Sequence, residues 1–108
     1  MKTTLHAAAL ALGVLAAASV GVFAASTVQV GQSNKLFEKT TVSVAVGDSV
    51  DFINRDTVAH NVMATGADAF NLGVMKPGET KSRKFDRAGK HEVKCALHPR
   101  MKMTVEVK

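Results

Sequence analysis

Apolar and polar residues alternate along most of the chain from residue 26 onward. Val42, Val44 and Val46 alternate with polar or small residues in one run, and Val50 and Phe52 do the same in the next. Successive side chains of a β-strand point to opposite faces, so a period of two predicts strands with one buried face. The pattern predicts strands over residues 27–30, 41–46, 49–54, 60–64, 80–86, 91–95 and 101–107, of which 80–86 has the weakest alternation.

Turn-forming residues separate these runs, and they stand at Gly31, Gly66, Gly73, Pro77-Gly78 and Gly89. Glycine and proline interrupt regular structure, so each marks a predicted turn. Beyond residue 25 no stretch carries apolar residues at the 3.6-residue period of a helix. Short strands with turns every 8–12 residues or so are typical of β-sandwiches. We therefore predict an all-β fold, a small Greek-key β-sandwich of seven to eight strands.

The first 25 residues differ in composition from the rest. Lys2 is the only Lys, Arg, Asp or Glu among them, an Ala/Leu-rich run follows, and Val22-Phe23-Ala24 has a small-x-Ala pattern. This is the layout of a secretory signal peptide. We expect residues 1–24 to be the signal peptide, with Ala25 as an alternative last residue, and residues 25–108 to be one exported, periplasmic domain. An uncleaved membrane anchor is the alternative, since about 20 apolar residues suffice to span a bilayer, but this run is mostly alanine, which inserts weakly.

Cleavage after Ala24 would leave 84 residues, a small single domain. Small secreted domains usually depend on disulfides or a metal, and the chain has one cysteine, so a metal is favoured. Without Lys2 the chain has 13 Lys and Arg residues against 9 Asp and Glu residues. This mild positive charge is compatible with an acidic partner surface and equally with ordinary solubility. Nucleic acid is not expected, because no basic stripe interleaves with aromatic residues.

The only cysteine lies in the stretch KCALHPRMKM, which also holds His98, Met101 and Met103. Each residue alone has an ordinary explanation: Cys95 as a small buried side chain, His98 as a surface loop residue, Met101 as core. Together they occupy the loop between two predicted strands, where a thiolate, an imidazole and a thioether would converge. These soft and borderline donors favour copper over calcium or magnesium.

Three donors from one loop leave a metal partly open, and His60 is the candidate for a fourth. It begins the predicted strand HNVMA after the loop RDTVA. Two histidines and a cysteine in a plane, with a weak axial methionine, make up the blue-copper ligand set. Met103 is the alternative axial residue, but a strand advances about 6–7 Å over two residues, which would carry it too far from the loop.

The segments VGDSVDFINRDTVAHNV and KPGETKSRKFDRAGKHEVKCALHPRM resemble the cupredoxins, the type 1 blue copper proteins. The short C-x-x-H-P-x-M loop is most similar to the amicyanin/plastocyanin-like group. Matched position by position, the resemblance implies a cupredoxin-like sandwich that binds one type 1 copper per chain. It implies the metal ligands His60, Cys95, His98 and Met101. It also implies that Asn61 ties the ligand loops together and that its backbone amide donates toward the cysteine sulfur.

Two positions depart from the family pattern without removing a ligand. His91 stands where the family usually has an aromatic residue, and we expect it to be a hydrogen-bonded, partly buried side chain rather than a second metal ligand. Leu97 stands where a proline is common.

The ligand set predicts one-electron transfer between larger redox proteins. No open position for a substrate and no flanking acid–base pair are evident, so an enzyme is not expected. The expected partners are dehydrogenase, cytochrome or oxidase proteins that bind transiently to a monomer with no membrane attachment after cleavage. Copper storage or delivery through the same ligands, a structural zinc site and a thiol redox module are the alternatives, and the last is disfavoured because C-x-x-C is absent.

Overall fold

The computed structural model describes residues 24–108. The predicted signal peptide lies outside this range except for Ala24, and so does most of the possible membrane anchor. Within residues 24–108 no helix is long and apolar enough to cross a bilayer.

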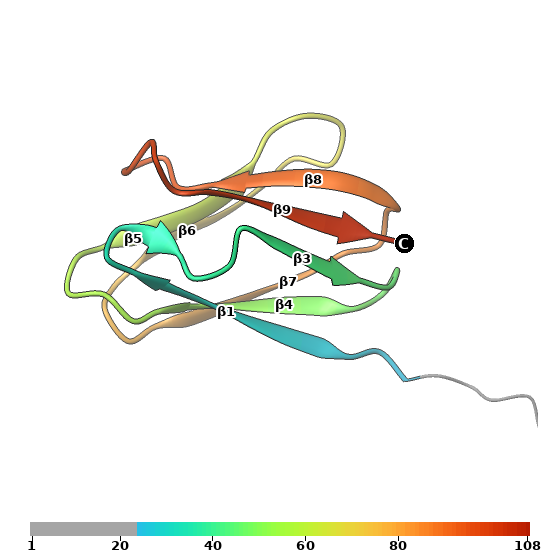
Figure 1. Ribbon diagram of the computed structural model, residues 1–108, viewed down its shortest axis with the longest axis horizontal. Coiled ribbons are helices and arrows are strands. Elements are labelled where there is room, and N and C mark those ends of the chain that lie inside the picture. Colours follow the sequence, from blue (N-terminus) through green and yellow to red (C-terminus); the bar gives the residue numbers. More distant parts are fainter. Residues whose placement is uncertain (1–23) are drawn as a thin grey trace, which may run out of the picture.

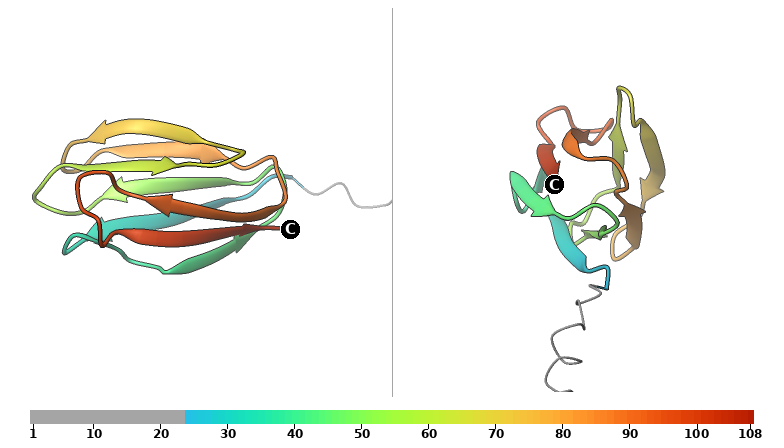
Figure 2. Two further views of the ribbon diagram at one scale, coloured as in Figure 1. Left: turned by 90° about the horizontal axis from the view of Figure 1, so that it is seen from above. Right: turned by 90° about the vertical axis from the view of Figure 1, so that its right-hand side faces the viewer.

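Residues 24–108 form nine β-strands, which confirms the predicted all-β class. Their bounds are β1 Thr27–Ser33, β2 Leu36–Phe37, β3 Thr41–Val44, β4 Ser49–Asn54, β5 His60–Ala64, β6 Phe70–Met75, β7 Thr80–Lys84, β8 Gly89–Lys94 and β9 Lys102–Val107. They make two sheets, with the strand orders β2-β1-β4-β7 and β3-β9-β8-β5-β6. The sheets face one another as the two layers of a sandwich (Figures 1 and 2).

The predicted alternation matches the buried faces of the strands. In β4 Val50 and Phe52 are fully buried, and in β9 Met103, Val105 and Val107 point into the core. Parallel pairing of β1 with β4 and of β3 with β9 connects strands that are distant in sequence. Burial of these alternating side chains between the two sheets supplies the main stabilisation of the fold.

The structure corrects the strand count and several strand boundaries: β1 continues through Gly31 to Ser33, β7 ends at Lys84, and β8 begins at Gly89. The strand predicted over residues 41–46 ends at Val44, because the Ala45 N–H turns away to the Asp48 carboxylate, and Val46 is left exposed. Strands β2 and β6 were not predicted. β6 contains Gly73, whose φ of 82° lies in the left-handed region and accompanies a register shift against β5. A glycine that marks a turn elsewhere here accommodates a bulge within a strand.

Four connections meet at one end of the sandwich: the β1–β2 turn, the β4–β5 loop, the β6–β7 loop and the β8–β9 loop (left in Figure 1). The β1–β2 turn is tight, with Asn34 at φ 54° and Lys35 at φ 58°. Positive φ at both central residues is the geometry of a type I′ turn, which is common in two-residue β-hairpins because its twist matches that of the flanking strands. The predicted ligands His60, Cys95, His98 and Met101 lie at this end.

Candidate metal centre

Three side chains from two of these loops converge at this end of the sandwich. The Nδ1 atoms of His60 and His98 are 3.2 Å apart, and the Cys95 Sγ lies 3.8 Å from the His98 Nδ1. One donor atom from each residue lies within 4.8 Å of the other two. His60 and Cys95 are buried, whereas His98 is partly exposed. The fold thus brings together three of the four predicted ligand side chains. Of these, His60 is 35 or more residues away from the other two in the sequence.

His60 is the first residue of β5, and a carboxylate binds the ring nitrogen that faces away from His98. Its Nε2 lies 2.9 Å from an Asp56 oxygen, and that same oxygen accepts the Lys35 backbone N–H at 2.8 Å. Hydrogen bonds from the Lys35 N–H, the His60 ring and the Thr57 N–H lower the pKa of Asp56 to about 2. An ionised carboxylate only accepts hydrogen bonds, so the His60 Nε2 carries a proton, and the Nδ1 atom is the ring nitrogen that faces the cluster.

Asn61 connects the β5 strand to the loop that carries Cys95. Its backbone N–H donates to the Cys95 Sγ at 3.2 Å, and its side-chain oxygen accepts the Ala96 N–H at 3.0 Å. The Asn61 side-chain amide donates to Asn71 and to the Gly73 carbonyl. The expected role of Asn61 is confirmed by these contacts. The hydrogen bond to the Cys95 sulfur holds it beside the start of β5.

The loop from Cys95 to Met101 is closed at its base by backbone hydrogen bonds. The Cys95 N–H donates to the Met101 carbonyl, and the Met101 N–H donates to the His98 carbonyl. Met101 is fully buried directly beyond this loop. Met103 lies further along β9, where it pairs with Val93 in the core.

The donors fit a soft or borderline metal ion. Nitrogen and thiolate ligands bind an ion such as zinc at about 2.0–2.3 Å, so two ligands of one ion lie within about 4.6 Å of each other. The 3.2 Å and 3.8 Å separations satisfy this limit. Two imidazoles and a thiolate select copper or zinc over calcium or magnesium, which prefer oxygen ligands.

Asp56 is the residue of this site that the sequence analysis missed. The available signal was a carboxylate four residues before a candidate histidine ligand. Orientation of a ligand histidine through its other ring nitrogen is a general feature of metal sites.

His91 lies away from the cluster, on β8 opposite Val105. Its Nε2 donates to the Arg87 carbonyl at 2.8 Å, and its ring packs edge-on against Phe85. The expectation of a hydrogen-bonded, partly buried side chain is confirmed.

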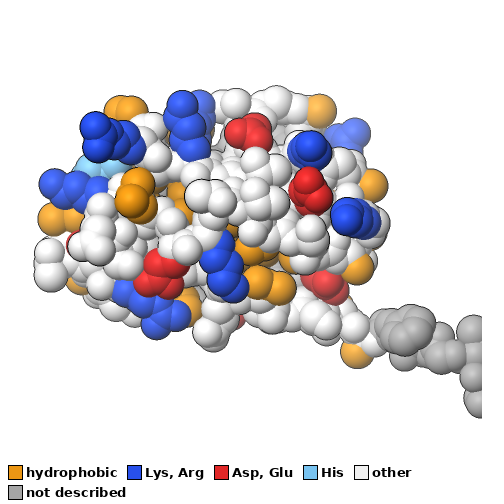
Figure 3. Space-filling view, viewed as in Figure 1, with side chains coloured by type: hydrophobic (Ala, Val, Ile, Leu, Met, Phe, Trp, Pro, Cys, Tyr) orange, Lys and Arg blue, Asp and Glu red, His pale blue; other side chains and the backbone are white. Residues whose placement is uncertain are grey.

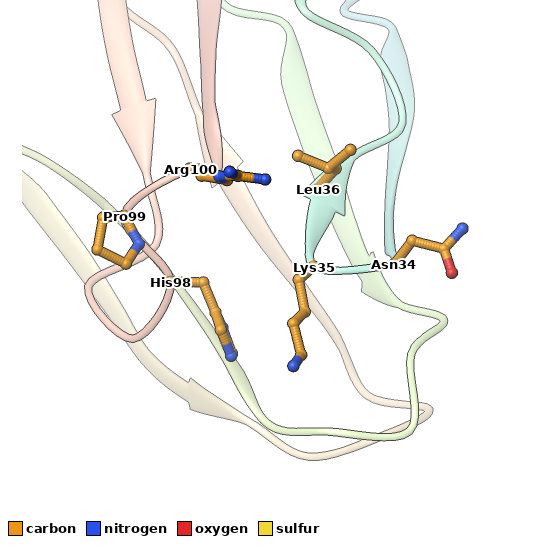
Figure 4. Close-up of a pocket in the computed structure, with 6 residues that line it drawn as sticks. All are labelled: Asn34, Lys35, Leu36, His98, Pro99 and Arg100. Atoms are coloured by element: carbon orange, nitrogen blue, oxygen red, sulfur yellow. The ribbon is translucent and has the colours of Figure 1, made fainter.

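A mostly apolar hollow of about 550 Å³ opens beside His98 (Figure 4). The β1–β2 turn forms one wall and the ligand loop forms the other, and the lining residues are Asn34, Lys35, Leu36, His98, Pro99 and Arg100. In Figure 4 the His98 ring and the Lys35 side chain extend in the same direction, toward the end of the molecule. One candidate ligand is therefore reachable from the surface.

Residues 24–108 match the family model of copper binding proteins of the plastocyanin/azurin family. The chain is 35% identical over 75 residues to amicyanin from Paracoccus denitrificans, a match covering 66% of this chain and 57% of the relative. It is 34% identical over 64 residues to the methylamine utilization protein MauL of Methylorubrum extorquens, covering 57% of this chain and 56% of the relative. The chain thus spans little more than half the length of these relatives.

Among solved structures, the reduced form of an amicyanin variant superposes with a TM-score of 0.72 at 30% identity, covering 80% of this chain and 86% of that chain. A purple cupredoxin from Nitrosopumilus maritimus shares the fold, with a TM-score of 0.69 at 20% identity, covering 75% of this chain and 99% of that chain.

Proposed function

The chain belongs to the plastocyanin/azurin family of copper-binding proteins, and on this premise we propose that it carries single electrons between larger redox proteins. The proposed copper ligands are His60, Cys95, His98 and Met101. Bound copper would supply one-electron chemistry by cycling between Cu(I) and Cu(II). The observation that carries the proposal is the convergence of two imidazole nitrogens on a thiol that already accepts the Asn61 N–H.

The chain's own residues hold the ligands in place before metal binds. Asp56 orients His60, and Asn61 holds the cysteine loop through its side chain. Ligands restrained in this way move little between two oxidation states, which favours fast electron transfer. Cys95 must lose its proton to bind copper, so acid opposes copper uptake.

His98 provides the proposed route for the electron to the surface. It is the partly exposed member of the cluster and borders the apolar hollow. Leu36 and Leu97 at this end are about half exposed. An apolar surface around an accessible ligand supports a small and transient contact with a partner. The proposed partners are of the dehydrogenase, cytochrome or oxidase type, and the chain acts as a monomeric carrier rather than an enzyme.

We also propose that the protein is exported to the periplasm, with residues 1–24 as signal peptide and residues 25–108 as the cupredoxin domain. Intact mass of the protein recovered from the periplasmic fraction tests this. A mass that retains the first 24 residues would contradict it.

The central experiment is addition of Cu(II) to the purified mature protein, followed by visible and electron-paramagnetic spectra. We expect one copper per chain and an intense blue thiolate-to-copper absorption, which Cys95→Ser abolishes. A Cys95→Ser protein that stays blue would exclude the ligand assignment. A wild-type protein that binds zinc but gives no cupric colour would support a structural zinc site instead. Slow electron self-exchange in a protein that does bind copper would favour copper storage or delivery.

A further inference from the structure

The exposed face of the β8–β9 ladder has three consecutive rungs of polar pairs. At the rung farthest from the ligand loop, Lys90 pairs with Glu106 at 3.9 Å. At the next rung, the Thr104 hydroxyl donates to Glu92 at 2.7 Å. Each charged side chain in these two rungs thus has a polar or oppositely charged partner on the other strand.

The third rung places Lys94 directly opposite Lys102, immediately before and after the ligand loop. Like charges directly opposite one another destabilise an antiparallel pair. Both lysines are exposed, and within residues 24–108 no carboxylate lies within 4 Å of either ammonium group. Folding therefore gains nothing from this pairing, in contrast to the two other rungs of the same face.

The two lysines overhang a second hollow of about 350 Å³, whose other lining residues are Met63, Cys95, Ala96 and Pro99. Among residues 24–108 no acidic residue lines this hollow. Two unpaired ammonium groups above an apolar floor match a surface in which carboxylates stand beside apolar side chains.

The same charge continues on the other side of the ligand loop. Lys35 and Arg100 line the hollow beside His98, and neither makes a salt bridge within the described part of the chain. The two nearby carboxylates are occupied: Asp56 by His60 and backbone N–H groups, and Glu38 by Ser33 and Arg55. Figure 3 shows Lys and Arg side chains gathered at the upper part of this end, around an exposed histidine.

We propose that the Lys94–Lys102 rung is the anion-binding part of a docking surface for an acidic redox partner protein, whose carboxylates bind between the two ammonium groups. This inference rests on the proposed function and names the partner's chemistry. When the two proteins meet, one electron passes from the reduced site to an oxidised centre of the partner. With a reduced partner, one electron passes from the partner to the oxidised site. The partner's carboxylates supply the negative charge that the ladder lacks at this rung.

Docking can be tested without electron transfer by adding the redox-inert paramagnetic anion hexacyanochromate(III) to the protein and recording amide NMR spectra. We expect the strongest broadening at Met63, Lys94, Ala96 and Lys102, and its loss in Lys102→Glu. The matched control is Lys90→Glu, which makes the same charge change on the same face about 13 Å along the strand, beyond a Debye length of about 8 Å at physiological salt. Broadening that is unchanged in Lys102→Glu would overturn the proposal.

Electron transfer is then measured with the Cu(I) protein and hexacyanoferrate(III), where Cu(I) is oxidised to Cu(II) as Fe(III) is reduced to Fe(II). We expect the rate constant to fall as salt rises and to fall several-fold in Lys102→Glu, with less than twofold change in Lys90→Glu. An acidic c-type cytochrome should show the same order, and a basic one should not. Equal rates for wild type and Lys102→Glu with the acidic cytochrome would contradict the proposal, whereas failure to form a blue site at all would contradict the proposed function.

Thermal unfolding separates docking from a structural role for the lysines. Lys102→Glu creates an opposite-charge rung, so its midpoint should equal or exceed that of wild type, while Lys90→Glu should lower the midpoint by opposing two carboxylates. A lower midpoint in Lys102→Glu would mean that Lys102 stabilises the folded protein and would contradict the proposal.

Vesicles of anionic phosphatidylglycerol test a membrane as the binding partner. Vesicle binding that depends on Lys94 and Lys102 would assign the surface to a membrane and overturn the protein-partner proposal.

Discussion

The carboxylate of Asp56 and the ring of His60 are joined at 2.9 Å through the oxygen that also accepts the Lys35 backbone N–H. One oxygen thus connects the β1–β2 turn to a residue of the candidate metal centre. The turn that forms one wall of the hollow beside His98 is therefore coupled to the orientation of the buried histidine.

Removal of the Asp56 carboxylate should weaken metal binding more than it weakens the fold. In Asp56→Ala the His60 Nε2–H loses its acceptor and the ring can rotate. Loss of such a partner typically lowers metal affinity about 10–100-fold. Competition with a copper chelator measures this, and Asp86→Asn, on an exposed carboxylate, serves as the control. Affinity within twofold of wild type in Asp56→Ala would show that the carboxylate does not position His60.

Asn61→Ala should destabilise the protein even without metal. The substitution removes the hydrogen bonds of the Asn61 side chain to the Ala96 N–H, Asn71 and the Gly73 carbonyl, and each such bond contributes about 0.5–1.5 kcal/mol. Denaturant unfolding of the metal-free protein gives this free energy. Asn71→Ala is the comparison: it removes the acceptor of the Asn61 amide and of the Gly73 N–H but leaves the bond between Asn61 and the Ala96 N–H intact. An Asn71→Ala effect as large as that of Asn61→Ala would show that the Ala96 contact contributes little.

Met101 and Met103 should respond differently to the same substitution. Met101→Leu should keep a coloured copper site with a raised reduction potential, because a weak donor that stabilises Cu(II) is lost. Met103→Leu, a volume-conserving change in the core, should leave the potential unchanged and cost less than about 1.5 kcal/mol of stability. Voltammetry and denaturant unfolding of both variants decide the matter. A potential that shifts only in Met103→Leu would exchange the two assignments.

Asp48 should contribute to acid sensitivity. Hydrogen bonds from the Ser26 N–H and then the Ala45 N–H hold the pKa of Asp48 below its usual value of 3.8. A carboxyl group with a lowered pKa in the folded state contributes stability above its unfolded-state pKa, and this contribution is lost as pH falls through the folded value. Asp48→Asn should therefore be less stable at neutral pH and lose less stability below about pH 4. Unfolding curves between pH 7 and pH 2 measure this, and parallel curves for wild type and variant would refute it.

Periodicity in the sequence predicted seven of the nine strands in residues 24–108 and their buried faces, because every second residue of such a strand is apolar. The two unpredicted strands lack this alternation. β2 has only two residues, and β6 has a bulge at Gly73, which breaks the period of two within that strand.

The sequence by itself determined the chemistry of the candidate site. Cys95, His98 and Met101 lie within one short loop, so their proximity follows from chain connectivity, and the soft donor set follows from their side chains. The tertiary structure decided which distant groups complete the site. His60 meets His98 from 38 positions away, Asp56 accepts both the His60 ring and the Lys35 backbone, and Lys94 stands opposite Lys102. A period of two encodes which face of a strand is buried, but the partner strand and its register are set by packing of the two sheets across long loops. Those long-range pairings bring His60 to the loop that carries Cys95 and His98, and they bring the Lys35 N–H to Asp56.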